Sequence, residues 1–139
     1  YSPAAANTAY TIELNETRIS NGVVIDGTYP SRIVVPQSGL YNIVATLQYS
    51  SSNASAKDIY SWVRKNGTDV VRSSRIISLS GTGSYNSVAL FETLSLNANE
   101  YFELVFASTD TTVTLDAAPA TAFAPGSPAV ALDVTQVQQ

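Results

Sequence analysis

The sequence predicts an all-β protein, an antiparallel sandwich or jelly roll of about ten strands, and two observations lead to this fold class. Short runs of β-branched and aromatic residues recur along the 139 residues, and turn residues separate them at regular intervals. No stretch has the roughly 3.6-residue apolar period of an amphipathic helix. A chain of this length fits one domain, which can bury roughly two-thirds of the surface that the unfolded chain exposes.

The stretch Gly39–Tyr49 is predicted to be a central strand of this fold. Its odd positions are apolar and its even positions are mostly polar, which is the period-two pattern of a strand with one buried face. A turn at Pro36–Gly39 sets its start, because proline fixes φ and glycine tolerates positive φ. The face expected in the core carries Tyr41, Ile43, Ala45, Leu47 and Tyr49, and the opposite face carries Val44, Thr46 and Gln48.

Three shorter strands are predicted before the central one, at residues 8–14, 22–27 and 31–35, because their apolar residues alternate or are β-branched between turn residues. Residues 1–7 are small, polar and proline-containing, which is typical of an N-terminal arm. We expect this arm to be disordered or to lie on another surface such as a neighbouring subunit. The single jelly-roll domain is then residues 8–139.

A hairpin is predicted immediately after the central strand and the polar loop that follows it. Asn66–Gly67 is the strongest two-residue hairpin signal, and it separates the apolar run at residues 59–64 from the run at residues 70–72. Residues 75–79 then form a further strand rich in isoleucine and leucine.

A second hairpin is predicted around the turn Asn97–Glu100. Residues 87–96 alternate as a strand, with a bulge after Leu90, and residues 101–106 are expected to pair back with them. The last two predicted strands are residues 113–115 and 129–137, separated by a segment at 117–128 that is too proline-broken for a helix.

The composition argues against most enzymes and against two classes of partner. The chain has no cysteine and no histidine, so the usual metal ligands and the usual general base are missing, and we expect neither catalysis nor a cofactor. Charged residues make up 13% and the net charge is -4, which does not give the basic surface that nucleic acids require. No apolar run approaches the roughly 20 residues of a membrane span.

The acidic residues leave one metal hypothesis open. They are scattered, and no stretch has the Asp-x-Asp-x-Asp-Gly spacing of a calcium loop. A calcium site assembled from separate loops stays an alternative to the simpler interpretation that these side chains are solvated turn residues. The residues concerned are Asp26, Asp58, Asp69, Asp110, Asp116 and Asp133.

Tyr60, Trp62 and Arg64 form the candidate partner-binding site, because alternate residues of a strand share one face. Aromatic rings beside a cation can stack on a sugar ring or anchor a protein partner. The alternative is that the two aromatic residues pack in the core or at a subunit interface.

The order of several short motifs resembles the tumour necrosis factor and complement-globular-head superfamily of trimeric jelly rolls. Gly39–Tyr41 is similar to the family's Gly-Leu-Tyr strand start, and Lys65–Gly67 is similar to its Lys-Asn-Gly hairpin. Leu94–Phe102 resembles its apolar-x-Leu-x-x-Gly-Asp-x-apolar stretch, and Ser127–Val134 stands where its closing strand lies. The spacing match covers roughly residues 8–137.

The chain resembles one subset of that superfamily more than the animal ligands. Asn99–Glu100 replace the family's Gly-Asp turn, and the closing strand has Ala129–Leu132 in place of aromatic residues. A cysteine-free chain rich in Ser, Thr, Asn and Ala that ends in Pro128–Val137 (PAVALDVTQV) is similar to domains in structural proteins of tailed bacteriophages.

The resemblance implies a homotrimer in which one sheet of each subunit faces a three-fold axis. The expected interface residues are Val44, Thr46, Gln48, Ala129 and Ala131, whose small or neutral side chains permit close approach. An ordinary solvated sheet face is the alternative, since Thr and Gln are common on such faces.

A virion location follows from the same resemblance, with capsid or other virion proteins as partners and a capsid decoration protein, cement protein or head fibre as the role. The alternative role is a receptor-binding tip, in which the loops at 50–55, 80–84 and 107–112 contact a host glycan or protein.

Overall fold

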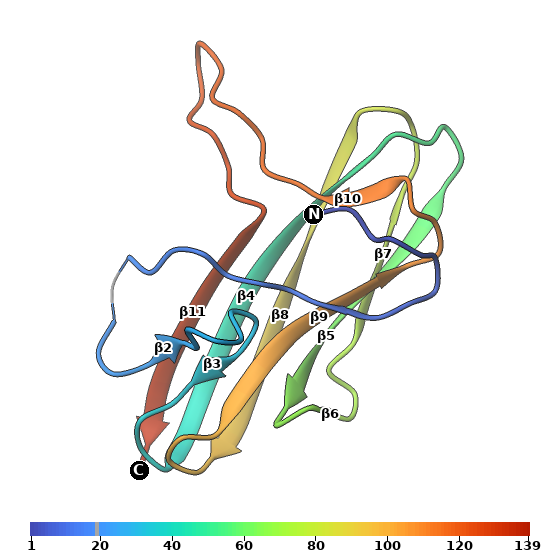
Figure 1. Ribbon diagram of the computed structural model, residues 1–139. Coiled ribbons are helices and arrows are strands. Elements are labelled where there is room, and N and C mark those ends of the chain that lie inside the picture. The colour runs from blue at the N-terminus through green and yellow to red at the C-terminus, as the bar shows by residue number, and fades with distance from the viewer. Residues whose placement is uncertain (19) are drawn as a thin grey trace.

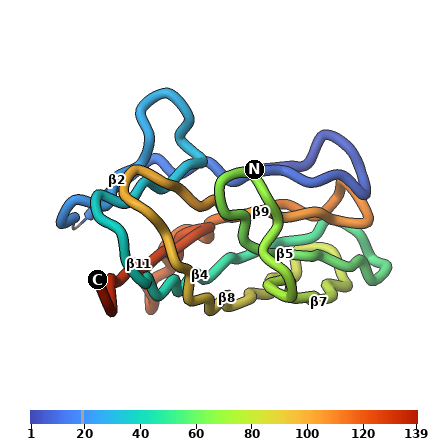
Figure 2. The backbone as a smooth tube through the Cα atoms, turned by 90° about the horizontal axis from the view of Figure 1, so that it is seen from below, coloured from blue at the N-terminus to red at the C-terminus, as the bar shows by residue number. Residues whose placement is uncertain are grey.

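The computed structural model describes residues 1–18 and 20–139, and all the regular structure in them is β-strand. The strands form two antiparallel sheets that pack face to face, which confirms the predicted all-β, antiparallel class (Figure 1). In Figure 2, β11, β4 and β8 lie in one layer, and β9 and β5 lie above it. No helix in the described part of the chain could cross a membrane.

The four-stranded sheet is built around the predicted central strand, β4, which runs longer than expected. It pairs with β8 along one edge and with β11 and then β10 along the other. Its strands are β4 (Gly39–Ser51), β8 (Ser84–Leu96), β10 (Val113–Leu115) and β11 (Val130–Gln138).

The seven-stranded sheet is built around β9 and β5, which pair with each other. One edge of β9 is shared by β1 and β3, and one edge of β5 is shared by β7 and β6. Its strands are β1 (Tyr10–Thr11), β2 (Val24–Ile25), β3 (Ile33–Val34), β5 (Lys57–Lys65), β6 (Thr68–Asp69), β7 (Arg75–Leu79) and β9 (Tyr101–Ser108).

The first three strands are shorter than the alternation predicts, because two of them divide one edge. β1 pairs with Val105 and Phe106, while β3 pairs with Tyr101 and Phe102, so neither can extend along the whole of β9. The predicted faces are nevertheless correct for residues 8–14, since Ile12 is buried and its neighbours at positions 10 and 14 pack against the core.

The hairpin turn at Asn66–Gly67 is confirmed, but the predicted return strand is wrong: β6 is only Thr68–Asp69, and residues 70–72 lie in the turn that leads to β7. Asn66 and Gly67 both have positive φ, 50° and 83°, as a type I′ turn requires, and β5 returns through this turn into β6. The Asn66 side chain also ties the turn to the β8–β9 corner, because its Nδ2 donates to Glu100 Oε2 at 2.6 Å.

Replacing Gly67 with alanine should destabilise the fold by about 1–2 kcal/mol, because a Cβ is strained at φ 83°. Gly27→Ala is the matched control, since a Cβ at this position would have no atom within 4 Å and its φ is not positive, and we expect a change below about 0.5 kcal/mol. Urea unfolding of both variants measures the difference, and equal effects would contradict the turn assignment.

The second predicted hairpin is wrong. β8 pairs with β4 and β9 pairs with β5, so the turn at Asn97–Glu100 carries the chain from one sheet to the other. The corner is held by Val35, whose N–H donates to the carbonyl of Glu100 and whose carbonyl accepts from Asn99. Because Leu96 and Phe102 on its two sides are both buried, the two strands cover the same core from opposite layers.

The bulge predicted after Leu90 is also absent, since the register between β8 and β4 is continuous from Ser84 to Leu96. In this continuous register Glu92, between Leu90 and Leu94, occupies an inward position. It stays half-exposed there because β8 pairs only with β4 within the described residues, which leaves its other edge free. An inward charge on an edge strand discourages pairing with another chain.

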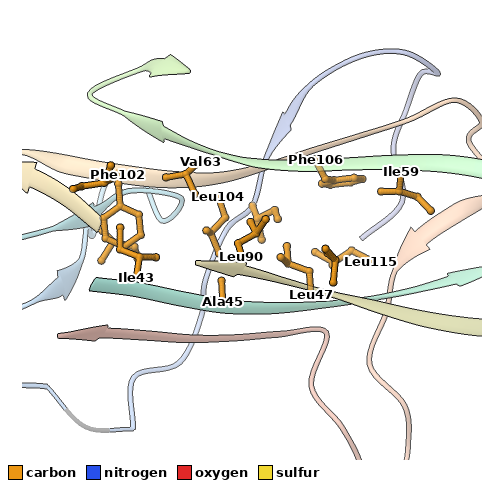
Figure 3. Close-up of a cluster of buried hydrophobic side chains, with 14 of the residues drawn as sticks. Ile43, Ala45, Leu47, Ile59, Val63, Leu90, Phe102, Leu104, Phe106 and Leu115 are labelled. Atoms are coloured by element: carbon orange, nitrogen blue, oxygen red, sulfur yellow. The ribbon is translucent and has the colours of Figure 1, made fainter. Parts of the chain in front are cut away.

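The core lies between the two sheets, as Figure 3 shows for side chains from both layers pointing toward one another. β4 contributes its five predicted apolar residues, each at most 1% exposed. Phe106 of β9 lies among aromatic rings of Tyr1, Tyr10 and Tyr49, with ring centroids 5.8–6.0 Å away. Burial raises the pKa of the Tyr49 hydroxyl, which is hydrogen-bonded to Ser61 Oγ at 2.7 Å.

The N-terminal arm, residues 1–7, lies on its own domain. The backbone of Tyr1 bonds Leu115 of β10 in both directions, and the Asn7 N–H donates to the carbonyl of Ser108 at the end of β9. Pro3 is buried between these two attachments. The arm therefore covers the ends of both sheets rather than extending away from them.

Candidate functional site

The outer side of the four-stranded sheet is the first candidate surface, and we call it the β4 face. It consists of the outward residues of β8, β4 and β11. The register places Phe91, Val44 and Asp133 in one row across the three strands, and Ala89, Thr46 and Ala131 in the next.

The five predicted interface residues do not all lie on this face. Val44, Thr46 and Ala131 are exposed on neighbouring strands, as expected. Gln48 is already engaged within the chain, because its Nε2 donates to the Asp116 carbonyl at 3.1 Å and its Oε1 accepts from Ser127 Oγ at 3.1 Å.

Ala129 also differs from the prediction. It lies in the bend just before β11 and packs, partly buried, against the core. Its carbonyl accepts a hydrogen bond from the Gln48 N–H at 2.8 Å, so its place is set by the edge of β4. The closing strand therefore contributes Ala131, and not Ala129, to the exposed β4 face.

Phe91 is the main residue of this face that the sequence analysis did not identify. Its side chain is 62% exposed beside Val44, which is 39% exposed, and the two line a shallow depression of about 250 Å³. Val88 and Leu90 point into the core, so regular alternation along the strand points Phe91 outward. The bulge expected after Leu90 prevented this assignment from the sequence. Asp133, on the far strand of the same row, was likewise not assigned to this face.

The outer side of the seven-stranded sheet carries the second candidate surface. Tyr60, Trp62 and Arg64 alternate with buried residues of β5, so they share one face outside the core, as predicted. Their cross-strand partners on β9 leave room over Tyr60, where the partner is only Ala107.

A depression of about 450 Å³ lies over this part of the sheet, and we call it the aromatic pocket. It is bounded on one side by β5 and on the other by the turn between β6 and β7. Its lining residues are Tyr60, Trp62, Asp69, Val70, Val71, Arg72, Ser74 and Ala107. Arg64 lies next to the pocket on β5 but does not line it.

Asp69 connects the side chains of Trp62 and Arg64, two residues of the predicted binding site. Its Oδ1 accepts hydrogen bonds from Trp62 Nε1 at 2.8 Å and from Arg64 Nε at 2.7 Å. These two donors hold the pKa of the Asp69 carboxyl below its usual value, with the Arg64 hydrogen bond as the larger cause. The carboxylate thereby fixes the indole ring of the only tryptophan in the chain.

Acidification should release this ring. Since the folded-state pKa of Asp69 is lowered, the hydrogen bonds persist above its ordinary pKa and are lost as the pH falls through the lowered value. We expect Trp62 fluorescence to change reversibly as the pH falls below about 4, the ordinary pKa of an aspartate, before or together with unfolding. Asp69→Asn is the control, because it cannot titrate, and an identical acid transition in that variant would contradict the assignment.

Two of the acidic residues considered for calcium hold turns by hydrogen bonds within the chain. Asp26 Oδ1 accepts from the N–H groups of Thr28 and Tyr29, and Asp110 Oδ1 accepts from Thr112. These turn hydrogen bonds lower the pKa of both carboxyls. Within residues 1–18 and 20–139, no three acidic side chains come close enough to hold a metal ion.

Comparison with known proteins adds no relative, because no protein-family model and no curated protein matches the chain. The fold and the two surfaces therefore define the class: a two-sheet, antiparallel β protein with an apolar patch on the outer side of each sheet.

Proposed function

We propose that this chain is a non-enzymatic structural protein of a bacteriophage virion, a trimeric jelly roll that decorates or cements the capsid or forms a head fibre. The jelly-roll topology is supported by the order of the longer strands, which alternate between the sheets. Among the five strands of at least eight residues, β5 and β9 belong to one layer, while β4, β8 and β11 belong to the other. The crossing at Asn97–Glu100 is one of these changes of layer.

The exposed pair Phe91 and Val44 on the β4 face is the observation that carries the trimer proposal. The neighbouring positions Ala89, Thr46 and Ala131 are small and uncharged, so a second subunit can approach the sheet closely. Full burial of an exposed aromatic or β-branched side chain supplies roughly 1.5–3 kcal/mol, and Phe91 and Val44 can gain the part of this that corresponds to their exposed area.

The position of Asp133 restricts where the axis can pass. Its carboxylate lies in the same row as Val44, but on the edge strand β11. A contact centred on β4 and β8 leaves this charge at the solvated rim, whereas a contact centred on β11 would bring three carboxylates together. We therefore place the centre of the subunit contact at Phe91 and Val44.

The absence of enzymatic activity stays part of the proposal and is supported by composition. Without histidine or cysteine, the chain lacks the two side chains that most often act as general base or strong nucleophile. The carboxylates with lowered pKa in the described part of the chain bind turns or the Trp62–Arg64 pair.

The experiment has two parts. Light scattering coupled to size exclusion should give three times the 14.7 kDa chain mass, and a monomer across the accessible concentration range would contradict the trimer. Electron microscopy of purified particles labelled with an antibody to the chain should then place it on the capsid or on a head fibre. Particles that carry no label would contradict the virion role even if the trimer stands.

A receptor-binding tip is the second candidate, favoured by the loop between β10 and β11, which projects beyond the end of the sandwich (Figure 1). The loop is closed at its base by two backbone hydrogen bonds between Ala118 and Ser127, and it exposes 91% of Phe123. The isolated domain should then bind host cells, and Phe123→Ser should weaken that binding. An absence of binding across susceptible hosts would exclude this role.

A further inference from the structure

The aromatic pocket has the dimensions and floor of a small-ligand site. Its volume of about 450 Å³ lies within the usual range for such sites, roughly 300–1,000 Å³. Tyr60 and Trp62 are two residues apart on one strand, so the points where their side chains leave the backbone are roughly 6–7 Å apart along the sheet. That spacing makes a continuous aromatic platform about as long as one six-membered sugar ring.

The platform is fixed before any ligand binds. The indole of Trp62 is held by Asp69, and Asp69 is held in turn by Arg64, so the ring loses little freedom on binding. Trp62 and Val105 are directly opposite each other in the register, and Val105 is fully buried although it points outward. The outer face of the sheet is therefore closely packed beside Trp62, on the side of β9.

The polar groups lie at the rim of the platform and not on it. Asp69 Oδ1 carries both hydrogen bonds, while Oδ2 accepts none from residues 1–18 and 20–139 and remains an acceptor. On the same side Arg72 is exposed in the left-handed region, at φ 64°, and its guanidinium is a donor. The pocket thus combines an aromatic floor with one charged acceptor and one charged donor at its edge.

A pyranose ring matches this arrangement, because it has an apolar face of C–H groups and hydroxyls around its periphery. A wholly apolar side chain would cover the platform but would use neither the Oδ2 acceptor of Asp69 nor the guanidinium of Arg72 at its rim. A nucleic acid is a poorer match, because the Asp69 carboxylate would repel its phosphates.

We propose that the aromatic pocket binds a pyranose sugar of a glycan. The apolar face of the ring stacks on Tyr60 and Trp62, one hydroxyl donates to Asp69 Oδ2, and another accepts from Arg72. A single ring held by such a shallow site should bind with a Kd in the range of about 1 mM. This inference depends on neither the oligomeric state nor the location of the chain.

The test follows the indole N–H resonance of Trp62, which is unique because the chain has one tryptophan. The intact chain is titrated with glucose, galactose, mannose, N-acetylglucosamine and glucuronic acid, each to about 0.1 M. We expect a saturable shift with at least one of them. No saturable shift with any of these sugars overturns the proposal, and so does a shift produced by a phenylalanine-containing peptide when every sugar fails.

Two pairs of variants separate stacking from folding. Tyr60→Ala should raise Kd roughly tenfold while Tyr60→Phe leaves it nearly unchanged, because only the ring is needed. Arg72→Gly should also raise Kd several-fold without loss of stability, since glycine accepts the left-handed φ that arginine adopts there.

Val24→Ala, on β2 at the far end of the same sheet, is the control that should leave Kd unchanged, since the side chain is 50% exposed and lies outside the pocket. If Tyr60→Ala and Arg72→Gly both bind as the unaltered chain does, the pocket is not the site and the proposal is overturned. An equal loss in Val24→Ala would also overturn it, because the effect would then be global.

Discussion

Val44→Asp should convert the proposed trimer into folded monomers. In the proposed assembly Val44 lies at the centre of the contact, beside Phe91, so the substitution places three carboxylates near the axis. An uncompensated buried charge costs about 3–5 kcal/mol, which exceeds what the lost valine contact contributed. Light scattering should give the mass of one chain at concentrations where the unaltered protein is trimeric, and far-ultraviolet circular dichroism should still report β-structure.

Two further variants separate the effect of charge at the interface from an effect on folding. Asp at position 44 also faces Asp133 across the strand pair, and that repulsion alone is slightly destabilising. Val44→Lys avoids the repulsion and should dissociate the trimer as well. Val71→Asp, at a site 83% exposed near the other sheet, should leave the trimer intact. A trimeric Val44→Lys variant would refute the placement of the β4 face at the axis.

Phe106→Ala should cost about 3–5 kcal/mol of stability, a large part of the 5–15 kcal/mol expected for a single domain. Phe106 is fully buried, and the ring of Tyr1 meets it edge-on at 82° between planes. The substitution removes the ring that joins the arm, β1, β4 and β9. The cavity can collapse only partly, because the surrounding rings belong to different elements.

Urea unfolding monitored by Trp62 fluorescence measures this loss. Phe123→Ala is the matched control: the residue is 91% exposed on the projecting loop, so its replacement should change stability by less than about 0.5 kcal/mol. Comparable losses in the two variants would mean that the aromatic cluster around Phe106 does not hold the sheets together.

Local patterns in the sequence were sufficient to locate the longer strands and the turn of the first hairpin. The alternation of Gly39–Tyr49 identified a strand whose one face is buried, because residues two apart point the same way whatever lies opposite them. Asn66–Gly67 was equally informative, since few residue pairs accept two consecutive positive φ values. The same two-residue alternation correctly placed Tyr60, Trp62 and Arg64 on one face of their strand.

Long-range pairing could not be predicted from these patterns. The turn Asn97–Glu100 looks like a hairpin turn, and only the partners of β8 and β9 show that it crosses between sheets. The hydrogen bonds that remove Gln48 and Ala129 from the predicted interface come from the loop that follows β10, which is distant from β4 in the sequence. The sequence predicts Asp69 only as a solvated turn residue. Its hydrogen bond with Trp62 depends on the pairing of β5 with β6.

The pairing of β11 with β4 has a consequence for synthesis on the ribosome. Leu132 of β11 lies opposite Ala45 of β4. This edge of β4 therefore cannot pair until β11, near the end of the described chain, has been synthesised. Until then Ile43 and Leu47 lack their neighbours Val134 and Val130, and the core stays open on that side. Pairings this distant in sequence form slowly, on a scale of roughly milliseconds to seconds. The nascent chain therefore exposes one apolar edge for longest, and a chaperone would be expected to act there.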